Sequence, residues 1–294
     1  MMIFFAAVGS RRAKAAASMA GVRNLLIAYG QGDSVFKLNS DLLSDPGANV
    51  LVDSGAFSIW NRGGSIKLSD YMAFAHRLRQ ESTCGLRFVN LDVIPGEAGR
   101  RPTPEETRRA ADTGWSNFMS MRAEGLPVLH VYHQHEHPSW LERLAAESDY
   151  IGISPANDVS VEERERWLDR VYSVIGTRVR THGFGVTVTS LLSRYPFYSV
   201  DSTTWCVGAK YGNVLKFLEA ERQVVQVQPS SVRKLMRELH KDLVPFSRSV
   251  DYRYQLGAAS MLRMEGYVTR LWEARGVRWD AAFDGASELE GIFG

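Results

Sequence analysis

The feature that most constrains the fold is a series of eight short apolar runs, each followed by a turn and a helical pattern, in about the first 200 residues. The runs are rich in β-branched and aromatic residues and mostly apolar throughout, which is typical of parallel strands covered on both faces. They span Met2 to Val8, Asn24 to Tyr29, Val50 to Asp53, Phe88 to Val93, Val128 to His133, Tyr150 to Ser154, Arg180 to Gly185 and Tyr198 to Asp201. Eight β-α units in series predict an α/β protein with a (β/α)8 TIM barrel.

The alternative α/β architecture is a doubly wound open sheet. That fold would favour a glycine-rich phosphate-binding turn after its first strand. The segment that follows the first run here, AVGSRRAK, is a poor match to such a turn. The barrel is therefore the favoured fold.

Helix start signals lie between the runs, and the pattern after Trp205 becomes purely helical. The start signals are Thr103 with Pro104 and Glu106, Ser160 with Glu163, and Ser69 ahead of a helix from Asp70 to Arg79. The additional C-terminal helices are expected over Lys210 to Arg222, Ser231 to Asp242 and Tyr252 to Arg275. We expect a catalytic barrel over residues 1–228 and a basic helical extension, packed on the barrel, over residues 229–294.

The distribution of charge permits a polyanionic partner. Residues 229–278 carry ten Lys or Arg against five Asp or Glu, whereas residues 279–294 carry four acids and no bases. No apolar run is long enough to cross a bilayer, so no membrane partner is expected. The two cysteines, Cys84 and Cys206, are consistent with free thiols in a reducing cytoplasm.

Three aspartates follow predicted strands. Asp53 ends the third run in VLVDSGAFS, Asp92 ends the fourth in FVNLDVIPG, and Asp201 ends the eighth in YPFYSVDSTTW. The C-terminal ends of barrel strands form one mouth, so these carboxylates should converge. The alternative for Asp201 is that it caps the next helix, a role that the hydroxyls of residues 202–204 could fill instead.

Converging carboxylates suit chemistry at a glycosidic bond. One can attack or stabilise the anomeric carbon while another handles protons. A third can accept N–H donors from a base. These roles make Asp53, Asp92 and Asp201 the candidate site residues.

Small and aromatic residues near the predicted mouth suit a flat ligand. The glycines, which remove side-chain bulk or simply form turns, are Gly55, Gly152, Gly183 and Gly185. The aromatics, which could stack on a base or belong to the core, are Phe57, Tyr132 and Phe184.

The segment HVYHQHEHP is rich in histidine. Strand alternation would place His133, His135 and His137 on one side, where they could bind a metal. Hydrogen bonding or solvent exposure of these residues is the favoured alternative, and no metal or other cofactor is expected.

The segment VDSGAFS resembles the DSGGFQ segment of the queuine and archaeosine tRNA-guanine transglycosylases, and HGFG followed by DSTTW is similar to HLFG followed by DSASY in the archaeal branch. The resemblance runs in order from about Val50 to Trp205. It implies a (β/α)8 enzyme that replaces guanine in a nucleic acid by a 7-deazaguanine through a covalent glycosyl-enzyme intermediate.

The resemblance also implies residue roles. Asp201 matches the nucleophile and Asp53 matches the acid/base aspartate. The residues that match base-binding positions are Asp92, Ser54, His133 or Gln134, and Gly152 or Ser154. Phe57 and Gly183 are further candidates for contact with the base.

The chain departs from the family pattern in ways that favour DNA over tRNA. Ala56 and Ser58 replace a glycine and the glutamine of DSGGFQ, which leaves the details of base recognition open. The family's tRNA enzymes carry a cysteine and histidine zinc site beyond the nucleophile, whereas only Cys206 and His240 follow Asp201 here. With about ninety residues after Asp201, the chain looks more like the compact phage and bacterial DNA-guanine transglycosylases.

The predicted function is exchange of guanine in DNA for a free 7-deazaguanine base of the 7-cyano-7-deazaguanine type. The location would be the cytoplasm, or the host cytoplasm if a phage encodes the chain. The alternatives are a tRNA-guanine transglycosylase, a non-catalytic nucleic-acid-binding subunit, and a barrel hydrolase acting on nucleosides or glycosides. Nucleic-acid phosphates would be held by Arg100, Arg101 and Lys210, and the sequence permits a homodimer.

Overall fold

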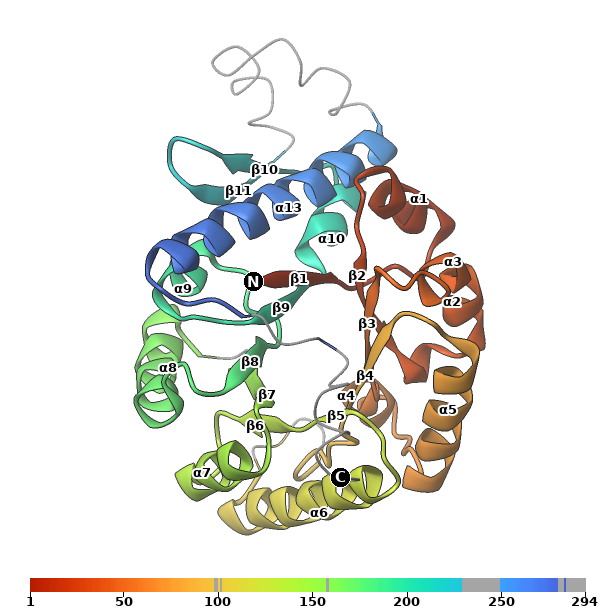
Figure 1. The fold of residues 1–294 in the computed structure, drawn as a ribbon, viewed down its shortest axis with the longest axis vertical. Coiled ribbons are helices and arrows are strands. Elements are labelled where there is room, and N and C mark those ends of the chain that lie inside the picture. Colours follow the sequence, from red (N-terminus) through yellow and green to blue (C-terminus); the bar gives the residue numbers. More distant parts are fainter. Residues whose placement is uncertain (98–99, 101, 157–158, 229–248, 280–282, 284–294) are drawn as a thin grey trace.

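The computed structural model of residues 1–294 describes the chain except for residues 98–99, 101, 157–158, 229–248, 280–282 and 284–294 (Figure 1). Its parallel strands form a ring, and the helices lie outside this ring (Figure 1). The predicted α/β barrel is therefore confirmed.

Nine strand segments form this sheet in the order β5-β4-β3-β2-β1-β9-β8-β7-β6. The bounds are β1 Met2–Phe5, β2 Asn24–Ala28, β3 Asn49–Asp53, β4 Gly85–Val89, β5 Val128–Leu129, β6 Val131–His133, β7 Tyr150–Ser154, β8 Arg180–Gly183 and β9 Ser199–Ser202. The two segments at the ends of the order, β5 and β6, are consecutive parts of one run, separated by His130. Because β5 pairs with β4 and β6 pairs with β7, this run closes the sheet into a barrel of eight strands.

His130, which separates β5 from β6, is held by contacts of its side chain. Its ring stacks on Phe118 of α6 (Pro104–Ala123) at a centroid distance of 5.0 Å. The Asn90 side-chain amide donates to His130 Nδ1 at 3.0 Å and to the Gly114 carbonyl at 2.9 Å. Burial lowers the pKa of His130 to about 4, so this ring is neutral at physiological pH. His130 is thus part of the barrel wall.

The helices begin largely where the sequence predicts. Besides α6, the helices of the described residues are α1 Arg11–Met19, η1 Tyr29–Gln31, α2 Asp33–Leu38, α3 Ser40–Leu43, α4 Ala56–Trp60, α5 Leu68–Glu81, α7 Pro138–Glu147, α8 Val161–Ile175, α9 Thr189–Arg194, α10 Thr204–Lys210 and α13 Val250–Ala274. Thr103 forms the predicted capping box with Glu106, and Ser160 accepts from the Glu163 N–H. Ser69 was predicted to cap α5, which is wrong: the helix already begins at Leu68, so Ser69 lies within its first turn.

Two predicted boundaries are corrected. Strand β4 runs from Gly85 to Val89 instead of from Phe88 to Val93, because the buried Arg87 lies within the strand and interrupts the apolar signal. The helix predicted over residues 210–222 is wrong. Val214–Leu218 (β10) and Gln223–Val227 (β11) instead form an antiparallel hairpin, since Gly212, with φ of +86°, turns the chain after α10.

The C-terminal part contributes one long described helix, α13, which agrees with the helix predicted over residues 252–275. It packs against α1, α10 and β10 (Figure 1). A Cβ on Gly257 would lie 2.1 Å from the Trp205 carbonyl oxygen, so only glycine permits this close approach of α13 to α10. The helix predicted over residues 231–242 lies outside the described residues.

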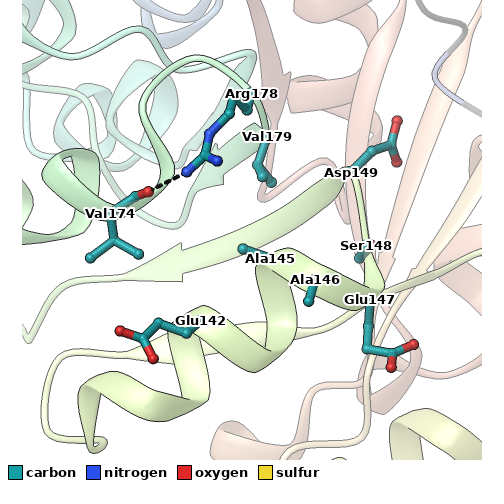
Figure 2. Close-up of a pocket in the computed structure, with 9 residues that line it drawn as sticks. All are labelled: Glu142, Ala145, Ala146, Glu147, Ser148, Asp149, Val174, Arg178 and Val179. Carbon is teal, nitrogen blue, oxygen red and sulfur yellow. Dashed lines mark hydrogen bonds between the residues drawn. The ribbon is translucent and has the colours of Figure 1, made fainter.

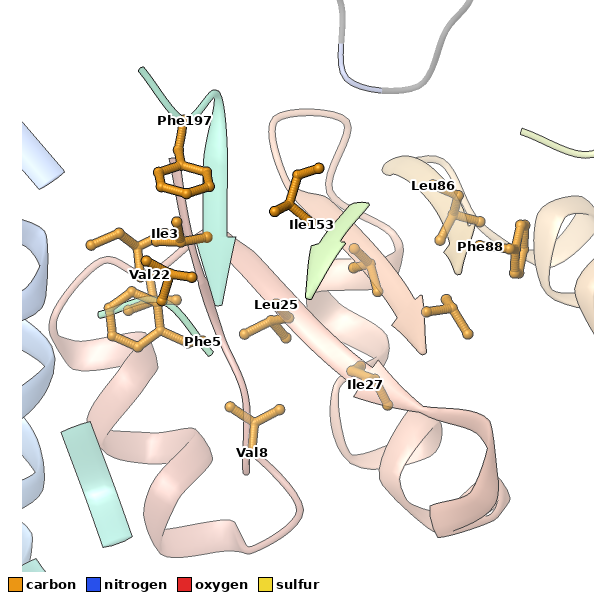
Figure 3. Close-up of a cluster of buried hydrophobic side chains, with 14 of the residues drawn as sticks. Ile3, Phe5, Val8, Val22, Leu25, Ile27, Leu86, Phe88, Ile153 and Phe197 are labelled. Carbon is orange, nitrogen blue, oxygen red and sulfur yellow. The ribbon is translucent and has the colours of Figure 1, made fainter. Parts of the chain in front are cut away.

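The core has two layers. The outer layer lies between strands and helices, with Ile3 and Phe5 of β1 beside Leu25 and Ile27 of β2 (Figure 3). The inner layer fills the barrel and contains Phe4, Leu51, Val89, Leu129, Val131, Tyr150, Tyr198 and Phe283. A filled barrel leaves the C-terminal ends of the strands as the place for a site. In the described part of the chain, no helix has the length and apolar character required to span a membrane.

Candidate functional site

A cavity of about 420 Å³ opens at the C-terminal ends of the barrel strands. Its lining comes from the segments that follow β3, β4, β6 and β7, together with Phe184 after β8. The polar residues that line it are Asp53, Ser54, Ser58, Asp92, Thr107, His133, Gln134, His135, Glu136 and Ser154. The predicted residues Asp53 and Asp92 thus share one cavity.

Asp53 is the last residue of β3, and its carboxylate accepts a hydrogen bond from the backbone two residues further along the chain. The Gly55 N–H donates to Asp53 Oδ1 at 3.2 Å. Gly55 has a φ of +75°, and a Cβ there would lie 3.0 Å from the Gly30 nitrogen, so this turn requires glycine. Burial raises the pKa of Asp53 to about 6, and the negative charges of Asp92 and Asp201 add to the effect against the hydrogen bond from Gly55. Asp53 can therefore exchange a proton near neutral pH.

Asp92 lies three residues beyond β4 rather than at its end. The Asn117 side chain holds this loop by donating to the Leu91 carbonyl at 2.9 Å. Asp92 Oδ2 lies 3.2 Å from His133 Nε2. Burial opposes protonation of His133, but the hydrogen bond and charge of Asp92 outweigh it and raise the pKa of His133 to about 9. The two residues form an ion pair at neutral pH.

Glu136 is a cavity residue that the sequence reasoning missed. Its Oε2 accepts from the backbone N–H of His133 at 3.3 Å, and the Glu136 N–H donates back to the His133 carbonyl at 3.0 Å. Burial raises the pKa of Glu136 to about 7, although the His133 charge opposes this shift. Its position within the histidine-rich segment was the available signal. The carboxyls of Asp53, Asp92 and Glu136 therefore line the same cavity as His133.

Asp201 lies in β9, and its side chain is 14% exposed. Oδ1 accepts from the Gly185 N–H at 2.8 Å and lies 3.6 Å from His182 Nε2. Asp201 does not cap α10: the capping position is Thr203, and Ser202 Oγ accepts from the Thr204 N–H at 3.1 Å. The alternative of a helix-capping aspartate is therefore wrong. Asp201 is not among the residues that line the cavity, although its negative charge contributes to the raised pKa of Asp53.

The candidate aromatic and small residues separate into two groups. Phe57 is 59% exposed at the cavity rim and lies 6.3 Å from the Trp60 ring, in a stacked arrangement. Phe184 lines the cavity, and Gly152 makes room for it, because a Cβ on Gly152 would lie 2.7 Å from that ring. Gly183 does not face the cavity in this way: a Cβ there would meet Phe197 at 2.8 Å. Gly183 therefore serves packing.

Tyr132 was a candidate for stacking on a base, and this prediction is wrong. The ring stacks on Trp167 of α8 at 5.8 Å, and the hydroxyl donates to the Glu136 carbonyl at 3.2 Å. Tyr132 is thus part of the core between the barrel and its helices.

The predicted base-binding residues Ser54, Gln134 and Ser154 all line the cavity. Gln134 Oε1 accepts from the Ala156 N–H at 2.8 Å, and its backbone N–H donates to the Ser154 carbonyl at 3.1 Å. Gln134 thereby fixes the segment after β7. Ser54 Oγ accepts from the Ala56 N–H at 3.4 Å.

The three histidines proposed as metal ligands have different surroundings. His133 pairs with Asp92, and His137 caps α7 by accepting from the Ser139 N–H. His135 lines the cavity, as His133 does. Within the described residues, no group of three or more His, Cys, Asp or Glu is arranged to hold a metal ion.

The candidate phosphate-binding residues are less well placed. Arg100 pairs with Glu106 at the start of α6, with Nη1 to Oε2 at 3.0 Å. Lys210 ends α10, and Arg101 lies outside the described residues. The described contacts of Arg100 and Lys210 therefore do not indicate a basic rim at the cavity.

A larger groove, of about 580 Å³, lies where α7 ends and β7 begins (Figure 2). Glu142, Ala145 and Glu147 line it opposite Val174 and Arg178 (Figure 2). The Arg178 guanidinium donates to the Val174 carbonyl at 2.7 Å. This groove lies at the N-terminal ends of the strands, the end of a barrel that usually serves stability.

The fold and the mouth together define a (β/α)8-barrel protein with a carboxylate-lined site at the C-terminal ends of its strands. No protein-family model and no curated protein matches the chain.

Proposed function

We propose that the protein is a base-exchange transglycosylase that replaces guanine in DNA by a 7-deazaguanine of the 7-cyano-7-deazaguanine type. The observation that carries the proposal is the presence of two carboxyls at strand ends: Asp201 in β9, whose Oδ1 accepts from the Gly185 N–H, and Asp53 at the end of β3, whose pKa burial raises to about 6. Exchange at a glycosidic bond needs a nucleophile that stays ionised and a neighbour that gives and takes a proton.

In the first displacement, Asp201 attacks C1′ of a guanine nucleotide that has been flipped out of the duplex. A bond forms between the Asp201 carboxylate and C1′, and the bond from C1′ to N9 breaks with its electron pair passing to guanine. Asp53 supplies the proton that neutralises the departing base. The partly protonated state of Asp53 near neutral pH supports this role.

In the second displacement, the incoming base gives its N9 proton to Asp53 and its N9 attacks C1′. The bond to Asp201 breaks, and the electron pair returns to that carboxylate. Two displacements restore the original configuration at C1′.

Base recognition falls to the cavity carboxylates. The Watson–Crick edge of guanine and of 7-deazaguanines presents N1–H and N2–H donors, for which carboxylate oxygens are suitable acceptors. Asp92 is the proposed acceptor, with Glu136 as a second carboxyl in the same cavity. The exposed ring of Phe57 at the rim is suited to stacking on a base.

DNA is proposed over tRNA because the sequence after Asp201 lacks the cysteine and histidine set of the tRNA enzymes. The ion pair of Arg100 with Glu106 favours a second candidate, a hydrolase of free nucleosides, which needs no basic rim. One experiment separates them: the protein is incubated with labelled guanine and either DNA or tRNA, and separately with nucleosides. Uptake of label into DNA supports the proposal, uptake into tRNA alone corrects its substrate, and release of base from nucleosides without uptake overturns it.

A covalent adduct tests the nucleophile. Wild-type protein trapped with a guanine oligonucleotide and a deazaguanine should give a slowly migrating band on denaturing electrophoresis. Asp201→Ala should give none, with Asp169→Ala, an aspartate on the outer helix α8, as the control that keeps the band. An adduct that persists in Asp201→Ala would refute Asp201 as the nucleophile.

A further inference from the structure

A chain of three buried polar side chains lies inside the barrel below Asp201. The Tyr150 hydroxyl lies 2.6 Å from Ser199 Oγ, and Ser199 Oγ lies 2.7 Å from His182 Nδ1. All three residues are completely buried. They come from β7, β8 and β9, so the contacts cross three neighbouring strands.

The far end of this chain is an unpartnered atom. His182 Nε2 has no hydrogen-bond partner among the described residues, although it is buried. It lies 3.6 Å from Asp201 Oδ1, which is too long for a hydrogen bond. Edge contacts with Phe4 and Phe184 fix the plane of the ring. A buried polar atom without a partner is unfavourable, so its retention beside a carboxylate calls for a role.

The direction of the hydrogen bonds follows from the donors available. Burial raises the pKa of Tyr150, so its hydroxyl keeps its proton and can donate to Ser199. Ser199 then donates to His182 Nδ1, which leaves Nε2 as the ring nitrogen that carries the proton. This arrangement points an N–H at Asp201, whereas the reverse direction would point a lone pair at a carboxylate.

We propose that His182 is a positioning residue for Asp201, and that Asp201 Oδ2 is the oxygen that attacks C1′. Oδ1 is held by the Gly185 N–H and faced by His182 Nε2, whereas Oδ2 has no hydrogen-bond partner among the described residues. The inference rests on the proposed function, because it assigns a task within that reaction.

The contribution of His182 differs between the two displacements. When Oδ2 bonds to C1′, Oδ1 becomes an ester carbonyl and loses negative charge. When the second displacement breaks that bond, charge returns to the carboxylate, and a donor fixed beside Oδ1 stabilises it as it forms. His182 should therefore matter for the release of the covalent intermediate as well as for aiming the nucleophile.

Two substitutions of His182 distinguish the effect of its Nε2 donor on Asp201 from the effect of its volume in the core. In His182→Gln the side-chain amide nitrogen can reach the place of Nε2, whereas His182→Leu fills the space without a donor. In single-turnover assays we expect His182→Leu to slow both formation and turnover of the adduct by about 100-fold, with unchanged affinity for the oligonucleotide. His182→Gln should recover rates to within about tenfold of wild type. Equal rates in the two variants, fast or slow, would overturn the positioning role.

The matched control is Ser260→Ala. Ser260 is a buried serine on α13 whose hydroxyl donates to the Leu215 carbonyl, and its loss should leave the rates unchanged. Ser199→Ala removes the donor to His182 Nδ1 and should slow the reaction less than His182→Leu does. A Ser199→Ala variant with wild-type rates would contradict the chain of donors.

A measurement without substrate keeps this inference separate from the proposed function. Nitrogen-15 NMR of the histidine ring should show His182 protonated on Nε2 and unprotonated on Nδ1, with this preference weakened in Ser199→Ala. The Nδ1–H tautomer in wild type would overturn the inference. Absence of any adduct in wild type, with the Nε2–H tautomer present, would instead refute the transglycosylase proposal.

Discussion

At the scale of the residue, Asp53 combines a stability cost with the proposed proton transfer. Its pKa is about 6 in the folded protein because burial and two neighbouring carboxylates disfavour the charge. An acid whose pKa rises on folding stabilises the folded state most at low pH. That contribution is lost as the pH rises from 3.8, the ordinary pKa of an aspartate, through about 6.

Replacing Asp53 by Asn should therefore raise the stability of the fold and slow catalysis. The amide keeps an acceptor for the Gly55 N–H and carries no charge, so at pH 7 we expect a gain of about 1 to 3 kcal/mol in the free energy of unfolding. Adduct formation should fall by about 10²- to 10⁴-fold, since the proton donor is lost. Urea unfolding at pH 5 and pH 7 checks the first expectation, and single-turnover rates check the second.

The pH dependence of adduct formation tests whether Asp53 is the proton donor. In wild type, the rate of adduct formation should decline as the pH rises above about 6, because Asp53 loses the proton that it must donate. The residual rate of the Asn variant should lack this decline. A variant as active as wild type would remove Asp53 from the mechanism.

At the scale of the element, helix α6 links the fold to the cavity. The capping box of Thr103 and Glu106 starts the helix, and Thr107 and Ala110 in its first turns line the cavity. The Thr103 hydroxyl accepts from the Glu106 N–H at 3.2 Å, and the Glu106 carboxylate accepts from the Thr103 N–H at 2.8 Å. The start of α6 is therefore fixed by its own sequence.

Thr103→Ala should lower the free energy of unfolding by about 1 kcal/mol, the usual effect of losing an N-cap hydroxyl. Thr113→Ala is the matched control, because Thr113 is exposed within the same helix and its hydroxyl only donates back to the Arg109 carbonyl. Thermal and urea unfolding of the two variants measure the difference. If the two substitutions have equal effects, the cap does not stabilise α6.

The elements also show what sequence patterns can and cannot predict. Apolar runs located all eight barrel strands, since strands covered on both faces have a continuous signal. The start of β4 was missed because Arg87 points into the barrel, where its guanidinium packs over Tyr150 and Nε donates to the Phe283 carbonyl. The hairpin of β10 and β11 was missed because burial does not alternate regularly along either strand, so the segment lacks the two-residue period that indicates a half-buried strand.

The sequence likewise predicts some features of the candidate site and misses others. The shared cavity of Asp53 and Asp92 could be predicted because strand ends converge in any barrel. The surroundings of Glu136 and His182 could not, because they depend on contacts between separate strands and loops. The pairing of Asp92 with His133 joins the loop after β4 to the end of β6, for example, and no local pattern encodes that contact.

At the scale of the whole molecule, Glu265 joins the last described helix to the first strand. It lies on α13, and its Oε2 accepts from the Ile3 N–H of β1 at 2.8 Å. Burial raises the pKa of Glu265 from 4.5 to about 7, against the opposing effects of that hydrogen bond and of the N-terminal amine. The stabilisation from this group is complete below pH 4.5 and is lost as the pH rises through 7.

Glu265→Gln should remove this dependence while keeping an acceptor for Ile3. Near pH 5, the variant and wild type should unfold at nearly equal urea concentrations, because the wild-type carboxyl is mostly protonated in the folded state. At pH 8, the variant should be more stable by about 1 to 3 kcal/mol, since wild type must hold a charge between α13 and the barrel.

Asp53 and Glu136 titrate in the same direction but are present in both proteins, so they cancel in the difference. Glu273→Gln, at an exposed position of α13, should leave the wild-type profile unchanged. A Glu265→Gln effect of the same size at pH 5 and pH 8 would show that packing, and not the charge, sets the stability of this junction.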